Sequence, residues 1–131
     1  LQIVDELGHL DLDSKTGKAP GGYNYLLYEI GVPFIFMNAV GAQRDLETMV
    51  HEGGHAIHSF LSRDLSLTAF KNLPSEVAEL ASMSMELLSM PQWSEFYPNE
   101  TEHKRAMREQ LEGTLKVLPW IAQFDAFQHW I

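Results

Sequence analysis

Two histidines four residues apart, with a glutamate directly after the first, constrain this chain more than any other feature. They form the segment His51-Glu52-Gly53-Gly54-His55. On a helix, side chains four residues apart lie on one face, so both imidazoles can bind the same metal ion. Glu52 would then lie beside the metal, where a bound water needs a general base, as in metalloproteases. The pattern therefore predicts a zinc hydrolase site with His51 and His55 as ligands and Glu52 as the catalytic base.

The alternative is an ordinary structural helix in which this pattern is accidental. Gly53 and Gly54 argue against it, because each glycine inside a helix is less favourable than alanine by about 0.8–1 kcal/mol. Close approach of another backbone, either a substrate strand or a packed helix, would explain them. We expect the helix to run from residue 44 or 45 to about residue 62, and metal analysis would separate the two readings.

A third ligand is expected from another segment, since catalytic zinc usually has three protein ligands and a water. The next predicted helix begins at Pro74, ends near Met90 and carries Glu76, Glu79 and Glu86. Spacing alone does not choose between Glu76 and Glu79, and glutamates on a helix more commonly form a solvated face. The same helix is expected to bury an apolar stripe made of Val77, Leu80, Met83, Leu87 and Met90.

Composition excludes several classes of protein. With 131 residues, 45% of them hydrophobic, the chain can form one modest core. It shows no apolar run of about 20 residues and no signal peptide, so no membrane partner is expected. The absence of cysteine excludes disulfides and thiolate zinc sites and fits a cytoplasmic protein. A net charge of −9 argues against nucleic acid.

The C-terminal third is predicted to be helical and aromatic. Asn99 and Glu102 form a capping box that starts a helix to about Val117, and Pro119 should kink or restart it. The last segment carries four aromatic side chains at helical spacing, namely Trp120, Phe124, Phe127 and Trp130. Such residues usually belong to a core, and in a truncated piece they would be exposed and would need another domain or a second chain to cover them.

Several stretches together resemble one family. Gly17–Tyr23, Phe34–Asn38, His51–His58 and Ala78–Ser82, followed by Glu86, occur in an order similar to that in the catalytic core of the oligoendopeptidase F and thimet oligopeptidase family. The resemblance implies a zincin-like fold, mainly α with a short β element, that binds one Zn²⁺ per chain. It also implies hydrolysis of peptide bonds in oligopeptides.

The resemblance selects the third zinc ligand. In that family, a glutamate opening a Glu-x-x-Ser-x-x-x-Glu pattern binds the metal, and here the pattern is Glu79, Ser82 and Glu86. Glu79 is therefore the expected ligand, and Glu86 is expected to hold a ligand histidine in position. Glu76 is left without a role.

Substrate contacts are expected on two short strands and on the active-site helix. Residues 23–30 and 33–38 are the predicted strands, after an opening segment and a polar loop over residues 13–22. By analogy with zinc peptidases, strand 33–38 would be an edge that binds an extended peptide through Phe36, Met37 and Asn38; equally, it could be a core strand. Tyr23 and His58 could line the substrate channel, although packing is the commoner role of such residues.

The resemblance also bears on how complete the chain is. Family members are several times longer, and their substrate-stabilising histidine and tyrosine side chains lie downstream of this metal core. We therefore expect residues 1–131 to be a truncated catalytic-core segment of a larger metallopeptidase, with loops and short strands in 1–42 and helices in 43–131. Its expected partners are an oligopeptide substrate and the remaining domains or a second chain. The alternatives are a catalytically incompetent metal-binding fragment and a purely structural helical module.

Overall fold

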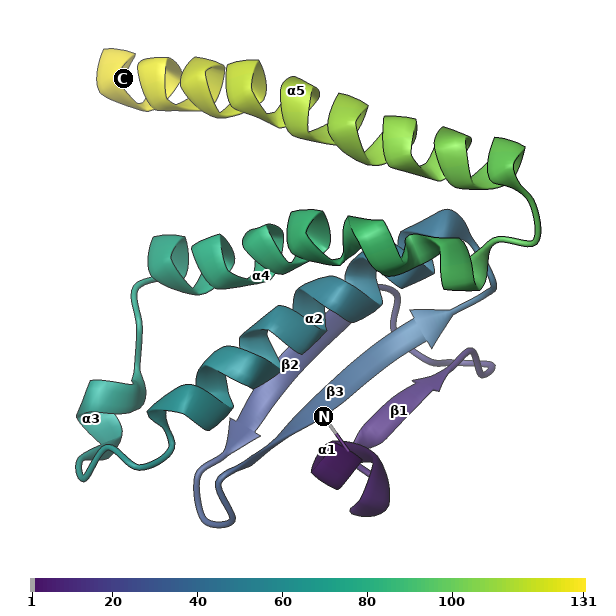
Figure 1. Cartoon of the computed structure of the whole chain (residues 1–131). Coiled ribbons are helices and arrows are strands. Elements are labelled where there is room, and N and C mark those ends of the chain that lie inside the picture. Colours follow the sequence, from purple (N-terminus) through teal and green to yellow (C-terminus); the bar gives the residue numbers. More distant parts are fainter. Residues whose placement is uncertain (1) are drawn as a thin grey trace. The chain divides into compact units, whose positions relative to one another are not determined.

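The computed structural model describes residues 2–131, which form one three-stranded sheet and several helices (Figure 1). They divide into two compact units, one that ends at Ser89 and one that runs from Met90 to Ile131. The first unit holds the sheet with α1 (Gln2–Glu6), α2 (Gln43–Ser62), α3 (Thr68–Lys71) and α4 (Ser75–Ser89). The second holds a 3-10 helix, η1 (Met90–Phe96), and α5 (Glu100–Trp130). Helix α2 begins at residue 43, but α1 lies within residues 1–42, where only loops and short strands were predicted. The division between the units falls after Ser89.

The sheet places β3 (Val32–Ala39) at its centre. It pairs in parallel with β1 (Leu10–Asp13) and antiparallel with β2 (Gly22–Leu27). The prediction that strand 33–38 is an open edge is therefore wrong, and the alternative core-strand reading is correct. The sequence analysis also missed β1, a four-residue strand whose partner lies more than twenty residues away along the chain. Such pairing depends on contacts that local sequence does not contain.

The core of the first unit lies between β3 and α2. Ile35 and Met37 point from β3 into it and Ala56 points from α2, and Leu10, Leu12, Ala39 and Met49 pack around them. Met37 is only 3% exposed. Its side chain belongs to the core, which follows from the alternation of β3 with one face against the helix. The sheet thus supports α2 from one side (Figure 1).

Helix α2 begins where Asp45 caps the preceding loop. One carboxylate oxygen, Asp45 Oδ2, accepts hydrogen bonds from the backbone N–H groups of Val40, Gly41 and Ala42 at 2.8, 2.7 and 2.7 Å. A carboxylate in the first turn also interacts favourably with the helix dipole. The helix ends at Ser62, as predicted, and it begins one residue earlier than predicted.

Helix α4 packs on α2 with the face that the sequence analysis did not expect. Its buried residues are Ser82 and Glu86. Of the predicted apolar stripe, only Met90, which lies beyond the end of α4, is buried; Val77, Leu80, Met83 and Leu87 are exposed. The prediction of a buried stripe on α4 is therefore wrong. The polar face is buried instead, because its side chains bind one another and residues of α2.

Helix α5 begins at the predicted cap and runs further than predicted. The Asn99 side chain accepts a hydrogen bond from the Glu102 backbone N–H at 3.0 Å. The helix then continues through Pro119 to Trp130, so the predicted end near Val117 is wrong. Proline's fixed φ is compatible with a helix, and its missing N–H removes only one backbone bond. The four C-terminal aromatic side chains are exposed.

No helix among residues 2–131 is long and apolar enough to cross a membrane.

Candidate metal centre

Three side chains from two helices converge at one point. Each of His51, His55 and Glu79 offers one ligand atom, and these atoms all lie within 4.8 Å of one another. The histidines come from consecutive turns of α2 and the glutamate comes from α4. Their side chains are 24%, 20% and 48% exposed, respectively. The cluster is thus partly buried on the α2 side and more open at Glu79.

Two distances between these side chains are close to the separation of two ligands on a tetrahedral zinc ion. His51 Nε2 lies 3.2 Å from Glu79 Oε2, and His55 Nε2 lies 3.6 Å from Glu79 Oε1. Two ligands at Zn–N and Zn–O distances of about 2.0–2.2 Å, separated by a tetrahedral angle, are about 3.3–3.6 Å apart. Two imidazole nitrogens and a carboxylate oxygen are also among the usual ligands of catalytic zinc. The residues present therefore fit the metal that their pattern predicts.

Glu86 holds His51 by its other ring nitrogen. The distance between His51 Nδ1 and Glu86 Oε1 is 2.6 Å. Glu86 lies seven residues after Glu79 on α4, so both carboxylates lie on the face toward α2. The hydrogen bond to Glu86 is the main reason why the pKa of His51 is raised, against the opposing effect of burial. A carboxylate on the Nδ1 atom fixes the orientation of the His51 ring, with Nε2 directed toward Glu79.

Ser82 connects the backbone of α4 to the cluster. Its hydroxyl is placed to donate to the Glu79 carbonyl oxygen at 3.0 Å and to Glu79 Oε2 at 3.1 Å. The second contact limits the rotation of the Glu79 carboxylate. Sequence reasoning included Ser82 only as part of the family pattern and gave it no role. The i, i+3 spacing of a hydroxyl and a carboxylate on one helix was the signal that could have indicated this contact.

Gly54 allows the two helices to come this close. A Cβ atom on Gly54 would lie 2.8 Å from Ser82 Cα, 3.0 Å from the Ala81 carbonyl oxygen and 3.0 Å from Met85 Cβ. Two of these atoms belong to the backbone of α4, which could yield only by moving the helix. The expectation that a packed helix explains a glycine here is therefore confirmed for Gly54.

Burial raises the pKa of two carboxyl groups beside the histidines. Glu52 is 6% exposed, and burial is the main cause of its raised pKa, with a further contribution from the charge of Glu79. The pKa of Glu47, one turn before His51, is raised by burial and by Glu86. Burial also lowers the pKa of His55, since it disfavours the charged imidazolium. A neutral His55 and a carboxyl group that holds a proton more readily both suit metal-assisted hydrolysis.

Comparison with known proteins identifies the family. Residues 3–131 match the model of peptidase family M3. The chain belongs to peptidase family M3. It is 30% identical over 122 residues to oligopeptidase PepF of Bacillus subtilis, a match that covers 93% of this chain and 18% of that protein. It is 35% identical over 77 residues to the chromosomal oligoendopeptidase F of Lactococcus lactis subsp. cremoris, covering 59% and 13%, respectively.

A solved structure matches nearly the whole chain. The structure of PZ peptidase A with an inhibitor is 32% identical, has a TM-score of 0.86, and covers 98% of this chain and 22% of its own. The chain thus spans less than a quarter of the length of that structure and 13–18% of the two curated relatives above. The likeness confirms the predicted family and the zincin-like, mainly helical fold with a short sheet.

The other residues considered for the site in this M3 chain lie outside the cluster of His51, His55 and Glu79. Glu76 is exposed and is not one of the clustered residues. The Asn38 amide points to the Lys18 and Ala19 carbonyl oxygens at 3.4 and 3.3 Å, so it holds the preceding loop. The rings of Tyr23 and Phe36 stack with centroids 4.9 Å apart. Because β3 is not an edge, the reason for assigning Phe36, Met37 and Asn38 to peptide binding is lost.

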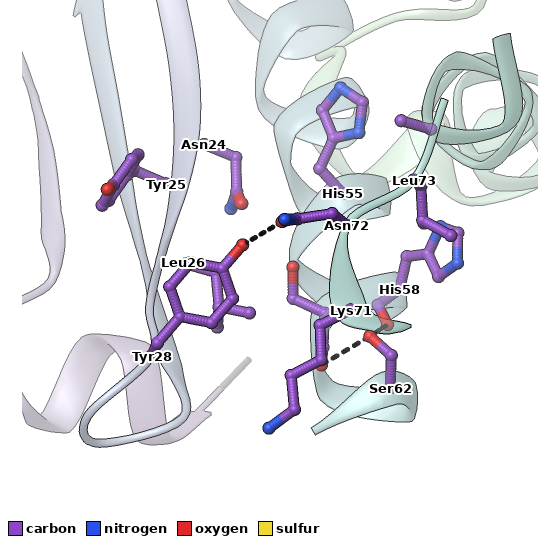
Figure 2. A pocket seen from close by; sticks show the side chains of 12 residues that line it. Asn24, Tyr25, Leu26, Tyr28, His55, His58, Ser62, Lys71, Asn72 and Leu73 are labelled. Carbon is purple, nitrogen blue, oxygen red and sulfur yellow. Dashed lines mark hydrogen bonds between the residues drawn. The ribbon is translucent and has the colours of Figure 1, made fainter. Parts of the chain in front are cut away.

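His58 lies in a pocket next to the cluster. The pocket has a volume of about 320 Å³ and lies between α2, the end of β2 and the segment around Asn72 (Figure 2). His55 and His58 both line it. Tyr28 donates a hydrogen bond from its hydroxyl to Asn72 Oδ1 at 2.6 Å across the pocket. A cavity thus lies directly beside a predicted zinc ligand.

Proposed function

We propose that this chain is the catalytic core of a zinc-dependent endopeptidase that hydrolyses peptide bonds in oligopeptides. The observation that carries the proposal is the convergence of His51, His55 and Glu79, whose ligand atoms all lie within 4.8 Å of one another. Two imidazole nitrogens and a carboxylate oxygen are usual ligands of catalytic zinc. Membership of family M3 supports the reaction class. One Zn²⁺ per chain would be held by His51, His55 and Glu79, with Glu86 fixing the ring of His51.

The chemistry divides between the metal and Glu52. Zinc, when bound, supplies a Lewis acid that lowers the pKa of a coordinated water toward about 7 and polarises the scissile carbonyl. Glu52 accepts the proton of the attacking water and later delivers it to the leaving amine. The raised pKa of Glu52 suits both steps, because a general acid–base group works best when its pKa approaches the working pH.

The substrate backbone is proposed to pair with β2 rather than with β3. Among residues 2–131, β2 has only β3 as a strand partner, so its other edge is open. The same pocket as His55 is lined by Asn24, Tyr25 and Leu26 of β2 and by Tyr28, which directly follows the strand. An extended peptide added to this edge would form main-chain hydrogen bonds while passing the metal. Tyr23 and His58 remain candidates for side-chain contacts.

The chain is further proposed to act as one segment of a longer cytoplasmic polypeptide. The relatives are several times longer, and in this chain many large apolar side chains are exposed on α4 and α5, including Leu80, Leu118, Phe124 and Trp130. Exposed apolar patches of this kind mark an interface. The remaining domains of the parent enzyme, or a second chain, would cover them and supply the groups that stabilise the reacting carbonyl oxygen.

The test combines zinc content with peptide turnover. The protein should bind one zinc ion, and His51→Ala or His55→Ala should remove it, because losing one of three ligands is rarely compensated. Glu52→Gln should keep the zinc and abolish hydrolysis, since the amide cannot accept a proton. Stoichiometric zinc in both histidine variants would overturn the site. Zinc binding without turnover, even in the longer polypeptide, would indicate an incompetent metal-binding protein instead.

A further inference from the structure

The pocket beside His55 has a chemical character of its own. Of the residues that line it in the described chain, none is an aspartate or glutamate, whereas Lys71 carries a positive charge. Lys71 donates a hydrogen bond from Nζ to the Arg63 carbonyl oxygen at 2.7 Å, which leaves its charge without a carboxylate partner there. The lining therefore disfavours a cationic side chain.

Two asparagine side chains in this pocket have N–H donors available for a ligand. Asn72 Oδ1 is occupied by the Tyr28 hydroxyl, so the Asn72 amide group presents its N–H donors to any further ligand. Asn24 Nδ2 is buried and has no hydrogen-bond partner among the described residues. A small rotation of the Asn24 side chain toward the pocket would let an acceptor oxygen satisfy this donor, which otherwise destabilises the fold.

The position of the pocket ties it to the reaction centre. His58 follows His55 by three residues, which is about 4.5 Å along the helix axis and little more than one residue of an extended chain. Asn24 of β2 and Tyr28, directly after the strand, line the same cavity. A peptide that pairs with this edge while its scissile bond lies at the metal would direct a neighbouring side chain into the cavity.

We propose that this pocket binds a substrate side chain close to the scissile bond and selects side chains with an acceptor oxygen, namely glutamate and glutamine, over lysine and arginine. The inference rests on the proposed peptidase function, because it places the substrate relative to the metal. Asn24, Asn72 and His58 are the residues that recognise the oxygen, and Lys71 adds the preference for a carboxylate. The volume of about 320 Å³ accommodates a side chain of this length.

The test measures binding directly and does not require turnover. Alanine-based hexapeptides carrying glutamate, glutamine, norleucine or lysine at each position in turn are titrated into the zinc-loaded, ¹⁵N-labelled Glu52→Gln chain. The side-chain amide signals of Asn24 and Asn72 should shift with glutamate and glutamine. Affinity should fall on the order of tenfold for norleucine, as expected from losing one or two neutral hydrogen bonds, and further for lysine. Equal affinities, a lysine preference, or unmoved amide signals would each overturn the proposal.

A charge-introducing variant sharpens the result. Asn72→Asp adds a carboxylate at nearly constant volume and should reverse the order, so that lysine peptides bind better than glutamate peptides. Asn99→Asp makes the same chemical change at the cap of α5, outside the pocket, and should leave the order unchanged. Loss of zinc or of hydrolysis with the peptide preference intact would contradict the peptidase proposal alone. Normal zinc-dependent hydrolysis without the preference would contradict only this inference.

Discussion

The two faces of α4 differ in a way that reverses the usual relation between polarity and burial. The face toward α2 carries Glu79, Ser82 and Glu86, and the last two are buried. The other face carries Leu80, which is 68% exposed, and three further apolar residues that are also exposed. Buried polar groups are tolerable only when they are paired, and here each has a partner on α2 or on its own helix. The buried face of α4 is therefore determined by the polar contacts of Ser82 and Glu86 and not by its apolar residues.

The largest effect on zinc affinity is expected from substituting Glu79, the proposed zinc ligand on the polar face of α4. Glu79→Gln should lower zinc affinity by more than about 100-fold, because removal of even an outer partner costs about 10–100-fold. Glu76→Gln is the matched control, since it makes the same change in charge on an exposed side chain of the same helix. Competition with a metal-binding dye measures both affinities. A larger loss in Glu76→Gln would show that the wrong glutamate has been assigned.

Local spacing predicted the part of the site on α2, whereas the residue on α4 could not be predicted from spacing. His51, Glu52 and His55 lie on one helix, so their spacing alone predicted that they share a site. Glu79 lies on a second helix whose position depends on the contact between Gly54 and Ser82. Spacing could not choose between Glu76 and Glu79, and the family pattern made that choice.

Features that depend on long-range contacts were predicted least well. The sequence of β1 is only four residues long, and its partner β3 lies far along the chain. The apolar residues of α4 recur with helical periodicity, and we therefore predicted that this face is buried. Periodicity identifies a face of a helix, but it does not show whether another element packs on that face. The helix that starts at Asn99 was predicted to end near Val117, whereas α5 continues through Pro119 to Trp130. In contrast, the cap at Asn99 depends on one local hydrogen bond and was predicted correctly.

The second effect concerns the hydrogen bond between Glu86 and His51. Glu86→Gln should weaken zinc binding by about 10–100-fold and leave the metal site otherwise intact. In the metal-free protein, the raised pKa of His51 means that the folded state binds its proton more tightly than the unfolded state. The stabilisation from this pair is therefore complete below pH about 6.5 and is lost as the pH rises through the folded pKa of His51.

This pH dependence has a specific measurement. Denaturant unfolding of the chelated protein and of Glu86→Gln, followed from pH 5.5 upward, should show the largest difference in stability at the acidic end. Zinc affinity should change in the opposite direction, since the proton on His51 competes with the metal and affinity rises with pH. A stability difference that grows with pH would mean that His51 is not protonated beside Glu86.

A third effect tests the close approach of the helices through a pair of glycines. Gly54→Ala introduces a Cβ only 2.8 Å from Ser82 Cα, so the cost of overpacking, about 1–3 kcal/mol, should outweigh the gain in helix propensity of about 0.8–1 kcal/mol. Gly113→Ala on α5 is the control, because a Cβ there meets nothing within 4 Å, and it should stabilise its helix. Thermal unfolding followed by circular dichroism compares the two. Equal stabilisation by both changes would contradict the tight packing of α2 on α4.

The smallest effect is expected on the apolar face. Leu80→Gln should change the stability of this chain by less than about 0.5 kcal/mol and leave zinc affinity unchanged, because the side chain is 68% exposed. Ser82→Ala, two residues away on the buried face, should weaken zinc binding because Glu79 loses the hydroxyl that holds it. A large loss of stability in Leu80→Gln, together with a concentration-dependent mass in solution, would show that copies of the chain already cover this face. If other domains of a longer polypeptide cover it instead, the same substitution should be nearly silent in this chain and costly in the longer protein, where Leu80 would be removed from water.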